Sequence, residues 1–497
     1  MVGRALGAIV VGLLGAFTSG CDDGGHGSLV IVNGGGGSTA STNTGSSNNN
    51  NGGGTTTIPP GTYTVVKADP GGGTVLQSAD GTTRKIAGSF SESLTMESQY
   101  TWVLDAPVFF GDDTATATPT LTIQAGTTVL GRGGTPPSML VIRRAAKLVA
   151  VGTAAAPIVF TSAQPVGSRA PGDWGGIVIN GRAPTNEIGP AGELPFGEGG
   201  SGKYGGTDAN DDSGELRYVR VEFAGHVFTS DDELNGIAFQ GVGAGTEVDF
   251  IQIHRNADDG VEFFGGTVNA KHVLITGALD DSLDWTSGWT GKVQFAVLQQ
   301  WAGGADNGIE ADNLAANNDA SPRSKPILSN VTVVGPAVAT EASDLGMHLK
   351  VGTAGNILNS IVTEMNEFAL DIDNTATFNN AYTDDPTSYT VLSGELTIRN
   401  CIFFANSLGD FQNDAGEPVT DATFGGQQTP PNQAVNPLLV APTSESAPDF
   451  RPGAGSPALN SATWVDPANA FFQAVNYVGA MDGTTDWTAG WTTHAPN

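Results

Sequence analysis

A short strand pattern with a carboxylate at its centre recurs along the middle of the chain. Its copies are Val261–Phe263 (VEF), Leu283–Trp285 (LDW) and Ile309–Ala311 (IEA), and each follows a turn that contains Asp. The copies are 22 residues apart (261 to 283) and then 26 residues apart (283 to 309). A strand that recurs at this interval, with no helical pattern between the copies, predicts a solenoid of stacked coils.

Alternation along each strand predicts which side chains face outward. Val261 and Phe263 face one side and Glu262 faces the other. In coils that stack in register, equivalent side chains lie about 4.8 Å apart. The predicted outward column contains Ala238, Glu262, Asp284, Glu310, His348 and Asp371. The turns beside it predict a second ladder of Asp258, Asp259, Asp280, Asp281, Asp306 and Asn307.

The composition agrees with a β solenoid and restricts its partners. The chain has 70 Gly, only 14% charged residues and a formal net charge of -30. Many Gly, Thr, Asn and Asp residues suit an all-β fold with tight turns. The acidity argues against nucleic acid and anionic membrane surfaces as partners, and no P-loop or dinucleotide fingerprint indicates a nucleotide. The two cysteines, Cys21 and Cys401, exclude a disulfide framework.

The N-terminal segment predicts export and a membrane anchor. Residues 1–20 contain Arg4 and an apolar run that fits a signal peptide. The end of this segment resembles a bacterial lipoprotein signal, which implies a lipid on Cys21, although Thr18 stands where that family usually has Leu. Ordinary secretion with a free Cys21 is the alternative. Residues 21–57 are rich in Gly, Ser and Asn and predict a flexible tether. We therefore expect a lipid-anchored protein of the cell envelope, at the outer membrane or cell surface.

The remaining chain predicts a small N-terminal cap over residues 58–118 and a solenoid over residues 119–497. Six segments of this region share a common strand-and-turn pattern: Leu121–Val129, Leu140–Thr153, Pro157–Ser162, Pro171–Arg182, Asn436–Val440 and Gly455–Leu459. They resemble right-handed parallel β-helix proteins, and in particular a family of bacterial secreted or lipoprotein β-helices with the pectin-lyase-like fold. The resemblance implies an all-β, right-handed parallel β-helix and implies no particular activity.

A column of carboxylates needs compensation, because stacked like charges destabilise a sheet face. Calcium takes oxygen ligands at about 2.3–2.6 Å, so one ion can bridge carboxylates of neighbouring coils. A solvated acidic face is the alternative. The candidate ligands are Asp259, Glu262, Asp281, Asp284, Asp306 and Glu310.

A second candidate calcium site lies in the segment Glu187–Glu215, which interrupts the rhythm of the coils. Here Asp208, Asn210 and Asp212 offer alternating oxygen ligands before Gly214. The glycine falls one place later than in an EF-hand loop, so a solvated turn is the alternative.

Aromatic and imidazole side chains near the acidic column suggest a ligand site. Flat rings beside carboxylates are typical of sugar-binding grooves, so Trp289 and Trp301 are candidate ligand-binding residues, with His348 nearby. Packing in the core is the favoured interpretation for each tryptophan, and exposure in such a groove is the alternative.

These features favour a calcium-stabilised binding or adhesion module for glycans or envelope components. The alternative is a calcium-dependent polysaccharide lyase or glycoside hydrolase, with Asp281, Asp284 and Glu310 as candidate catalytic residues. Lyases of this fold need an Arg or Lys base, which no recognisable motif supplies. Of the hydrolase set Asn-x-Asp, Asp-Asp, Gly-His-Gly and Arg-x-Lys, only Asp-Asp recurs, and it recurs in several coils. Repetition along a ladder indicates binding rather than one catalytic centre.

Overall fold

The computed structural model describes residue 58 and residues 61–229, 232–336, 345–384, 392, 394–413, 419–459 and 464–497. The predicted signal peptide, Cys21 and the tether lie outside the described residues. In the part of the chain that is described, no helix combines the length and apolar character needed to cross a bilayer.

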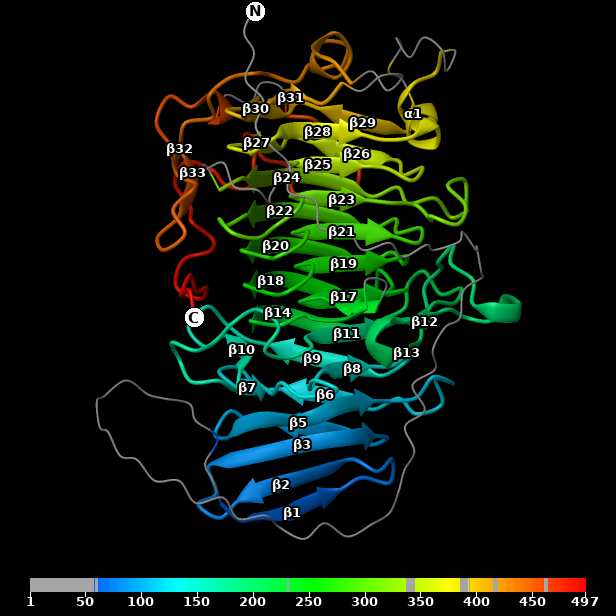
Figure 1. The fold of residues 1–497 in the computed structure, drawn as a ribbon, viewed down its shortest axis with the longest axis vertical. Helices are drawn as coiled ribbons and strands as arrows, with labels where there is room; N and C mark the ends of the chain where they lie inside the picture. Colours follow the sequence, from blue (N-terminus) through cyan, green and yellow to red (C-terminus); the bar gives the residue numbers. More distant parts are fainter. Residues whose placement is uncertain are drawn as a thin grey trace, which may run out of the picture. The chain divides into compact units, whose positions relative to one another are not determined.

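Successive coils stack into an all-β, right-handed parallel β-helix, as predicted (Figure 1). Each coil passes through three faces. The first face contains β4 (Leu94–Met96), β6 (Thr120–Ile123), β9 (Lys147–Val151), β26 (Gly355–Leu358) and β29 (Leu396–Arg399). The second face contains β3 (Thr83–Phe90), β5 (Thr101–Phe110), β7 (Thr128–Gly131), β10 (Ile158–Ser162), β27 (Ile361–Thr363) and β30 (Ile402–Phe404).

Five longer strands run through both of these faces, and a third face carries the predicted acidic column. The longer strands are β14 (Gly214–Glu222), β18 (Glu247–His254), β20 (Asn269–Thr276), β22 (Lys292–Gln299) and β24 (Ile327–Val334). The third face, called the site face below, contains β8 (Leu140–Ile142), β11 (Ile177–Asn180), β17 (Ile237–Gln240), β19 (Val261–Phe264), β21 (Leu283–Thr286), β23 (Ile309–Ala311), β25 (Met347–Leu349), β28 (Phe368–Ile372) and β31 (Gly409–Phe411).

The core lies inside the coils and is built by the alternation seen in the sequence. Val261 and Phe263 are each 1% exposed and point inward. Aromatic side chains stack from coil to coil, with the ring of Phe263 5.3 Å from Phe239 and 4.0 Å from Trp289. Each inward position therefore continues the core of the coil before it, as expected when a repeat buries its apolar face against its neighbour.

The long strands bend between the first and second faces at residues with left-handed backbone. Two kinds of side chain occupy this corner. Aromatic rings stack at about 4–5 Å, as between Phe250 and His272 at 4.1 Å. Asparagines occupy the same corner in the later coils, since Asn tolerates positive φ. They bond to one another, and the Nδ2 of Asn400 donates to the Oδ1 of Asn359 at 2.8 Å. We call this row the corner ladder; its members, all with φ between 47° and 63°, are Tyr218, Phe250, His272, Phe295, Asn330, Asn359 and Asn400.

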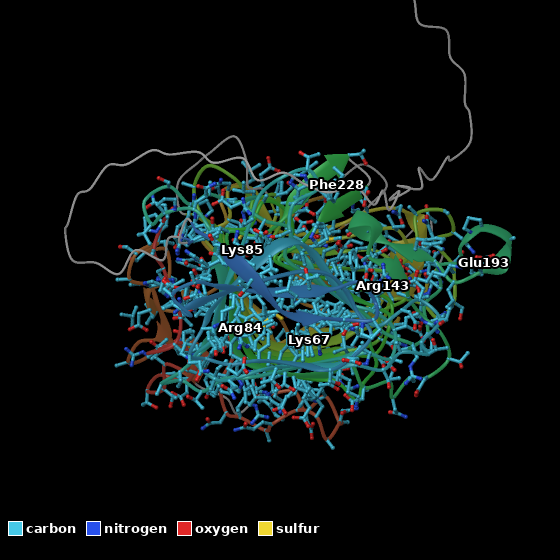
Figure 2. The ribbon with its side chains drawn as sticks, turned by 90° about the horizontal axis from the view of Figure 1, so that it is seen from below. Lys67, Arg84, Lys85, Arg143, Glu193 and Phe228 are labelled. Atoms are coloured by element: carbon cyan, nitrogen blue, oxygen red, sulfur yellow. The ribbon has the colours of Figure 1, made fainter. Side chains whose placement is uncertain are left out.

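The N-terminal end of the stack is closed by β1 (Tyr63–Ala68) and β2 (Thr74–Ser78), which pair antiparallel with each other, and β2 also pairs antiparallel with β3. Basic residues line these strands, as Figure 2 shows for Lys67, Arg84 and Lys85. Such charges discourage edge-to-edge association of an exposed strand. Parallel stacking already begins between β3 and β5, so the boundary expected at residue 118 falls within the stacked coils.

Beyond Gln433 the described residues add no further coil. The chain forms an antiparallel hairpin, β32 (Leu439–Ala441) and β33 (Asp449–Pro452), and a C-terminal tail, 464–497. The tail runs back along the stack towards β14 (red in Figure 1). It covers outward apolar residues of the second face, because Leu274 and Val297 cluster with Met481 of the tail. The short helix α1 (Thr375–Ala381) follows β28.

The corner ladder generates a first prediction. Asn359 is fully buried, donates to Ser329 Oγ and the Val465 carbonyl at 2.9 Å each, and accepts from Asn400. Replacing Asn359 by Ala should lower the free energy of unfolding by about 3–5 kcal/mol, since each buried group left unpaired costs about 1–3 kcal/mol. Asn359→Gly should cost about 1 kcal/mol less, because glycine adopts positive φ without strain.

Chemical denaturation of both variants measures these differences. Asn476→Ala, at an exposed position of the tail, is the matched control and should leave the transition unchanged. Equal destabilisation by Ala and Gly would show that positive φ carries no cost at this position.

Candidate functional site

The predicted outward column forms in the predicted register. Glu262 of β19 pairs with Asp284 of β21, which pairs with Glu310 of β23. Glu310 in turn pairs with His348 of β25, which pairs with Asp371 of β28. These side chains point away from the core, because the residues on either side of each are buried inside it. The strands thus hold carboxylates of three successive coils one rung apart.

The turn ladder forms beside this column, and its hydrogen bonds explain why Asp recurs there. The carboxylate of Asp259 accepts from the backbone N–H of Asp281 at 3.0 Å. The carboxylate of Asp281 accepts from the backbone N–H of Asn307 at 2.6 Å. Each turn aspartate therefore caps the turn of the next coil, which leaves part of its acceptor capacity for another ligand.

Two segments lie over the middle of the column and bury Glu262 and Asp284. One is the Glu187–Glu215 excursion, whose hairpin β12 (Phe196–Gly197) and β13 (Gly202–Lys203) encloses the turn Glu198–Gly200. The other is the hairpin of β15 (His226–Thr229) and β16 (Asp232–Leu234). The backbone N–H of Gly199 donates to Asp232 at 2.6 Å and joins the two covering segments.

The covering segments bring additional carboxylates against the column. The Nδ2 of Asn235 donates to Glu262 at 2.8 Å and to Glu198 at 3.5 Å, so one amide links the column to its cover. Glu262 is 8% exposed and Asp284 is 9% exposed. A cavity of about 180 Å³ lies between column, turns and cover. Every described residue that lines it is acidic: Glu198, Glu233, Asp258, Asp259, Glu262, Asp280, Asp281, Asp284 and Glu310.

Burial and mutual repulsion make these carboxyl groups hard to ionise. Burial first, and then Glu233 and Asp280, raise the pKa of Asp258 to about 8. Burial and the neighbouring Asp306 raise the pKa of Asp280 to about 6. The same two causes raise the pKa values of the deepest members well above the ordinary range; these are Glu198, Asp259, Glu262, Asp281 and Asp284. A cavity of this kind attracts protons or cations.

The oxygens of the cavity are arranged so that one ion can reach several of them. The Oδ1 atom of Asp284 is buried and has no hydrogen-bond partner in the described part of the chain. A buried, unpaired acceptor is costly, and it points to an interaction partner outside the protein. Three overlapping groups place one oxygen per residue within 4.8 Å of one another: Asp258, Asp259 and Asp280; Asp259, Glu262 and Asp284; Asp280, Asp281 and Asp306.

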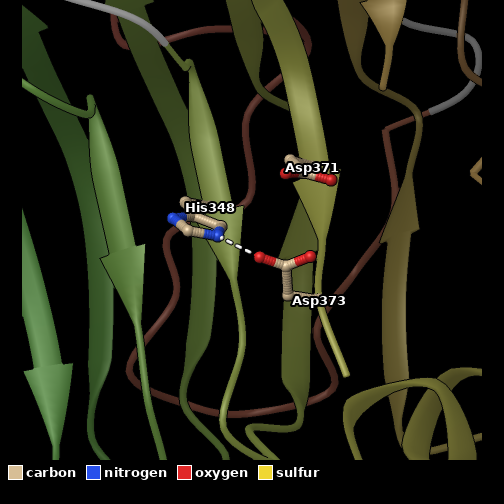
Figure 3. A group of neighbouring side chains, drawn as sticks. All are labelled: His348, Asp371 and Asp373. Carbon is tan, nitrogen blue, oxygen red and sulfur yellow. Dashed lines mark hydrogen bonds and ion pairs between the residues drawn. The ribbon is translucent and has the colours of Figure 1, made fainter. Parts of the chain in front are cut away.

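The column changes character beyond Asp284, where cationic side chains compensate it. Glu310 accepts from Lys350 Nζ at 2.8 Å and lies 3.6 Å from His348 Nδ1. His348 Nε2 lies 2.8 Å from a carboxylate oxygen of Asp373 (Figure 3). Burial alone would lower the pKa of His348, but hydrogen bonds with Glu310 and Asp373 raise it to about 9.

This cationic end is a poor transition-metal site, although His348, Asp371 and Asp373 lie close enough to share an ion (Figure 3). A metal-bound imidazole must be unprotonated, whereas His348 has two carboxylate neighbours that favour imidazolium. His348, expected as a ligand-binding residue, therefore serves here as a partner of carboxylates.

The structure brings together most of the ligands expected for calcium and adds others. Asp259, Glu262, Asp281, Asp284 and Glu310 line the cavity, and Asp306 joins one of the three oxygen groups. Asp258 and Asp280 were recognised as turn residues but not as ligands. Glu198 and Glu233 lie in the covering segments, which do not repeat from coil to coil. The spacing of the strands therefore gives no position for them. The acidic composition of the Glu187–Glu215 excursion was the signal that could have indicated Glu198.

The second candidate calcium loop has other partners for its carboxylates. Asp212 pairs with Lys147 at 2.5 Å, and Asp208 lies 3.7 Å from Arg182. The exposed Asn210 donates its backbone N–H to Asp208 at 3.1 Å and forms a local turn. The cationic side chains Lys147 and Arg182 thus lie against these carboxylates, where the second calcium site would need a metal ion.

The structure buries Trp289 and Trp301, in agreement with the favoured packing in the core, and so does not support them as ligand-binding residues. Trp289 is 0% exposed, stacks on Phe263 at 4.0 Å and donates its indole N–H to the Val268 carbonyl at 3.2 Å. Trp301 is 3% exposed and donates to Gln299 at 3.1 Å. Both lie outside strands, where alternation does not apply, and both fold back into the protein. Buried rings cannot serve as platforms for a sugar.

Comparisons with known proteins agree with this architecture. No curated protein and no solved structure matches the chain significantly. The family described as the pectate-lyase like beta helix domain matches residues 88–432, which is more than half of the 497 residues. The matched region begins within β3 and ends beside Gln433, where the stacked coils end. The chain therefore belongs to the pectate-lyase-like β-helix domain family.

Proposed function

We propose that this chain is a calcium-stabilised binding module, held at the cell envelope by a lipid on Cys21. The observation that carries the calcium part is the covered cavity lined by carboxylates, with the buried, unpartnered Oδ1 of Asp284 among them. The anchor rests on the sequence of residues 1–57 alone, which also supplies a tether between Cys21 and the coils.

Calcium suits this cavity better than other common metals. It accepts 6–8 oxygen ligands in flexible geometry, and a site made only of carboxylate oxygens offers no nitrogen or sulfur ligand for zinc or copper. Magnesium retains several of its waters and prefers strict octahedral geometry, which suits fewer carboxylates. Asp259 and Asp280 each belong to two of the three oxygen groups, so neighbouring ions could share them.

The catalytic alternative receives less support from the cavity. Its volume of about 180 Å³ is below the range of about 300–1,000 Å³ typical of small-molecule sites. A lyase also needs a basic group that can lose its proton. Lys350 donates to Glu310 of the cavity at 2.8 Å, and although burial lowers the pKa of its amine, Asp312 and Glu310 raise it. Structural cation binding therefore fits the geometry better than catalysis.

Calcium should raise the thermal stability of residues 58–497 strongly. A ligand that binds only the native state at 100 times its dissociation constant adds about 2.7 kcal/mol. Melting with calcium and with chelator should show this rise. It should be lost in Asp284→Asn, because the amide removes one negative charge and one anionic ligand. Glu247→Gln, an exposed carboxylate of β18 beside Arg217, is the matched control and should retain the full shift.

Isothermal titration of calcium into the same variants separates binding from stability. Equal binding by the wild type and Asp284→Asn would contradict the proposed site. Absence of a calcium shift in the wild type would contradict the proposal itself.

Without calcium, stability should fall as the pH rises. The folded carboxyl groups have raised pKa values, so the native state binds more protons than the unfolded state, and the free energy of unfolding decreases with pH. The decrease should run from the ordinary carboxyl pKa of about 4 through the values of about 6 for Asp280 and about 8 for Asp258. Melting temperatures measured in chelator from pH 4 to pH 8 check the sign. A melting temperature that rises across this range would contradict the burial of these groups.

Replacing a carboxyl group of the covering segments by an amide should favour the folded protein without calcium and weaken calcium binding. Glu198→Gln removes one carboxyl group that burial and Asp258 make hard to ionise, so the chelated variant should lose less stability than the wild type between pH 4 and pH 8. The same substitution should weaken calcium binding by about tenfold, on the order of 1.4 kcal/mol for one charged ligand. Calorimetry with calcium and melting in chelator give the two readouts.

Glu193→Gln is the matched control for this pair of measurements. Glu193 lies in the same excursion, on a loop that projects from the coils, and pairs with Lys203 at 2.5 Å (Figure 2). It should change neither quantity. A Glu198→Gln variant that shifts both quantities in the same direction would contradict closure of the cavity by this carboxylate.

A further inference from the structure

A second cavity lies on another part of the molecule, between the corner ladder and the C-terminal tail. Its volume is about 220 Å³. Two of its rings come from the corner ladder and two from the tail, together with one thioether and one carboxylate. The lining residues are His272, Phe295, Gln473, Tyr477, Met481, Asp482, Thr485 and Trp487.

Hydrogen bonds fix both walls of this cavity. Gln294 of β22 donates to and accepts from the backbone of Gln473 at 2.8 Å in each direction. Asn330 of the corner ladder donates to the Tyr477 carbonyl at 3.0 Å. The indole N–H of Trp487 donates to the Ala480 carbonyl at 3.0 Å. The tail therefore holds its rings in place before any ligand arrives, which reduces the entropic cost of binding.

The four rings lie close to one another around the cavity. The ring centroids of His272 and Phe295 are 5.1 Å apart in a stacked arrangement. The indole of Trp487 lies 5.3 Å from His272 and is turned by 67° against it. The ring of Tyr477 lies 6.4 Å from Phe295. Rings that meet at such angles form a concave aromatic wall rather than a flat platform.

One fixed negative charge completes the wall. Asp482 accepts from the backbone N–H of Thr484 at 2.6 Å and from its hydroxyl at 2.8 Å. Burial alone would raise the pKa of Asp482, but these hydrogen bonds and those of Thr485 lower it. No lysine or arginine is among the described residues that line the cavity. Arg451, which donates to the Thr484 carbonyl, is held by Asp449 at 2.7 Å.

We propose that this aromatic pocket binds a small organic cation, of the alkylammonium or quaternary ammonium class. Aromatic faces attract such cations, and a desolvated contact contributes more than an exposed one. Asp482 supplies the opposite charge, and Met481 and the rings contact the methyl groups. The cavity accommodates a head group rather than a drug-sized molecule. Gln473, Tyr477 and Thr485 offer polar side-chain ends that a sugar could also use, so the carboxylate of Asp482 is the feature that favours a cation. The pocket is separate from the acidic cavity and does not depend on calcium.

Binding of choline in the presence of chelator tests this proposal. Calorimetry should show saturable binding of choline to the protein. The fluorescence of Trp487, measured against a Trp487→Leu variant, should show the same binding. The neutral isostere 3,3-dimethylbutan-1-ol has the same shape without the charge and should bind at least about tenfold more weakly. Asp482→Asn should weaken choline binding by about tenfold.

Asp466→Asn, an exposed aspartate of the same tail, is the matched control and should bind choline as the wild type does. Circular dichroism and melting temperature establish that each variant is folded. Equal affinity for choline and its neutral isostere, or binding of glucose in place of choline, would overturn the proposal. Binding that survives Asp482→Asn unchanged in a folded protein would overturn it as well, as would the absence of choline binding to the wild type.

Discussion

Parallel hydrogen bonding between successive coils holds residues of the same coil position about 4.8 Å apart. For apolar and aromatic residues this repetition is favourable, because each side chain packs on its own kind in the next coil. The Phe239, Phe263 and Trp289 rings stack inside the coils in this way, and the corner ladder stacks outside them. For carboxylates the same repetition is unfavourable. A β-helix that repeats an acidic residue must therefore supply a positive charge, protons or solvent at that position.

The site face handles this constraint differently along its length. Towards the N-terminus the column position is apolar, with Val178 and Ala238. Towards the C-terminus Lys350 and His348 neutralise Glu310. Only the middle, around Glu262 and Asp284, is both buried and without a cationic side chain among its lining residues. The covering segments add the carboxyl groups of Glu198 and Glu233 at this point, and no cationic side chain among the described lining residues. The repulsion between carboxylates is therefore strongest where calcium is proposed.

Much of this arrangement could be predicted from the sequence because register follows from the repeat. The pairing of Glu262, Asp284 and Glu310 needed only the spacing of strands and their alternation. The covering segments could not be placed in this way, since Glu198 reaches the column from an excursion with no repeat. Trp289 follows its strand, where alternation does not give the side it faces, and it turns back onto Phe263. One feature of the sequence indicates that the tail covers the coils. Strands such as β22 are apolar on both sides, which is typical of strands that are buried on both faces.

The C-terminal tail changes how the coils depend on one another. In a simple solenoid each coil contacts only its neighbours, so the ends can fray while the middle persists. Here the tail bonds to Asn359 between β26 and β27, to Gln294 in β22 and to Gln252 in β18. Fraying of any of these coils also breaks contacts that are shared with the others. The tail thus converts a one-dimensional array into a more cooperative unit, in which Thr493 bonds to a coil that lies 241 positions earlier in the chain.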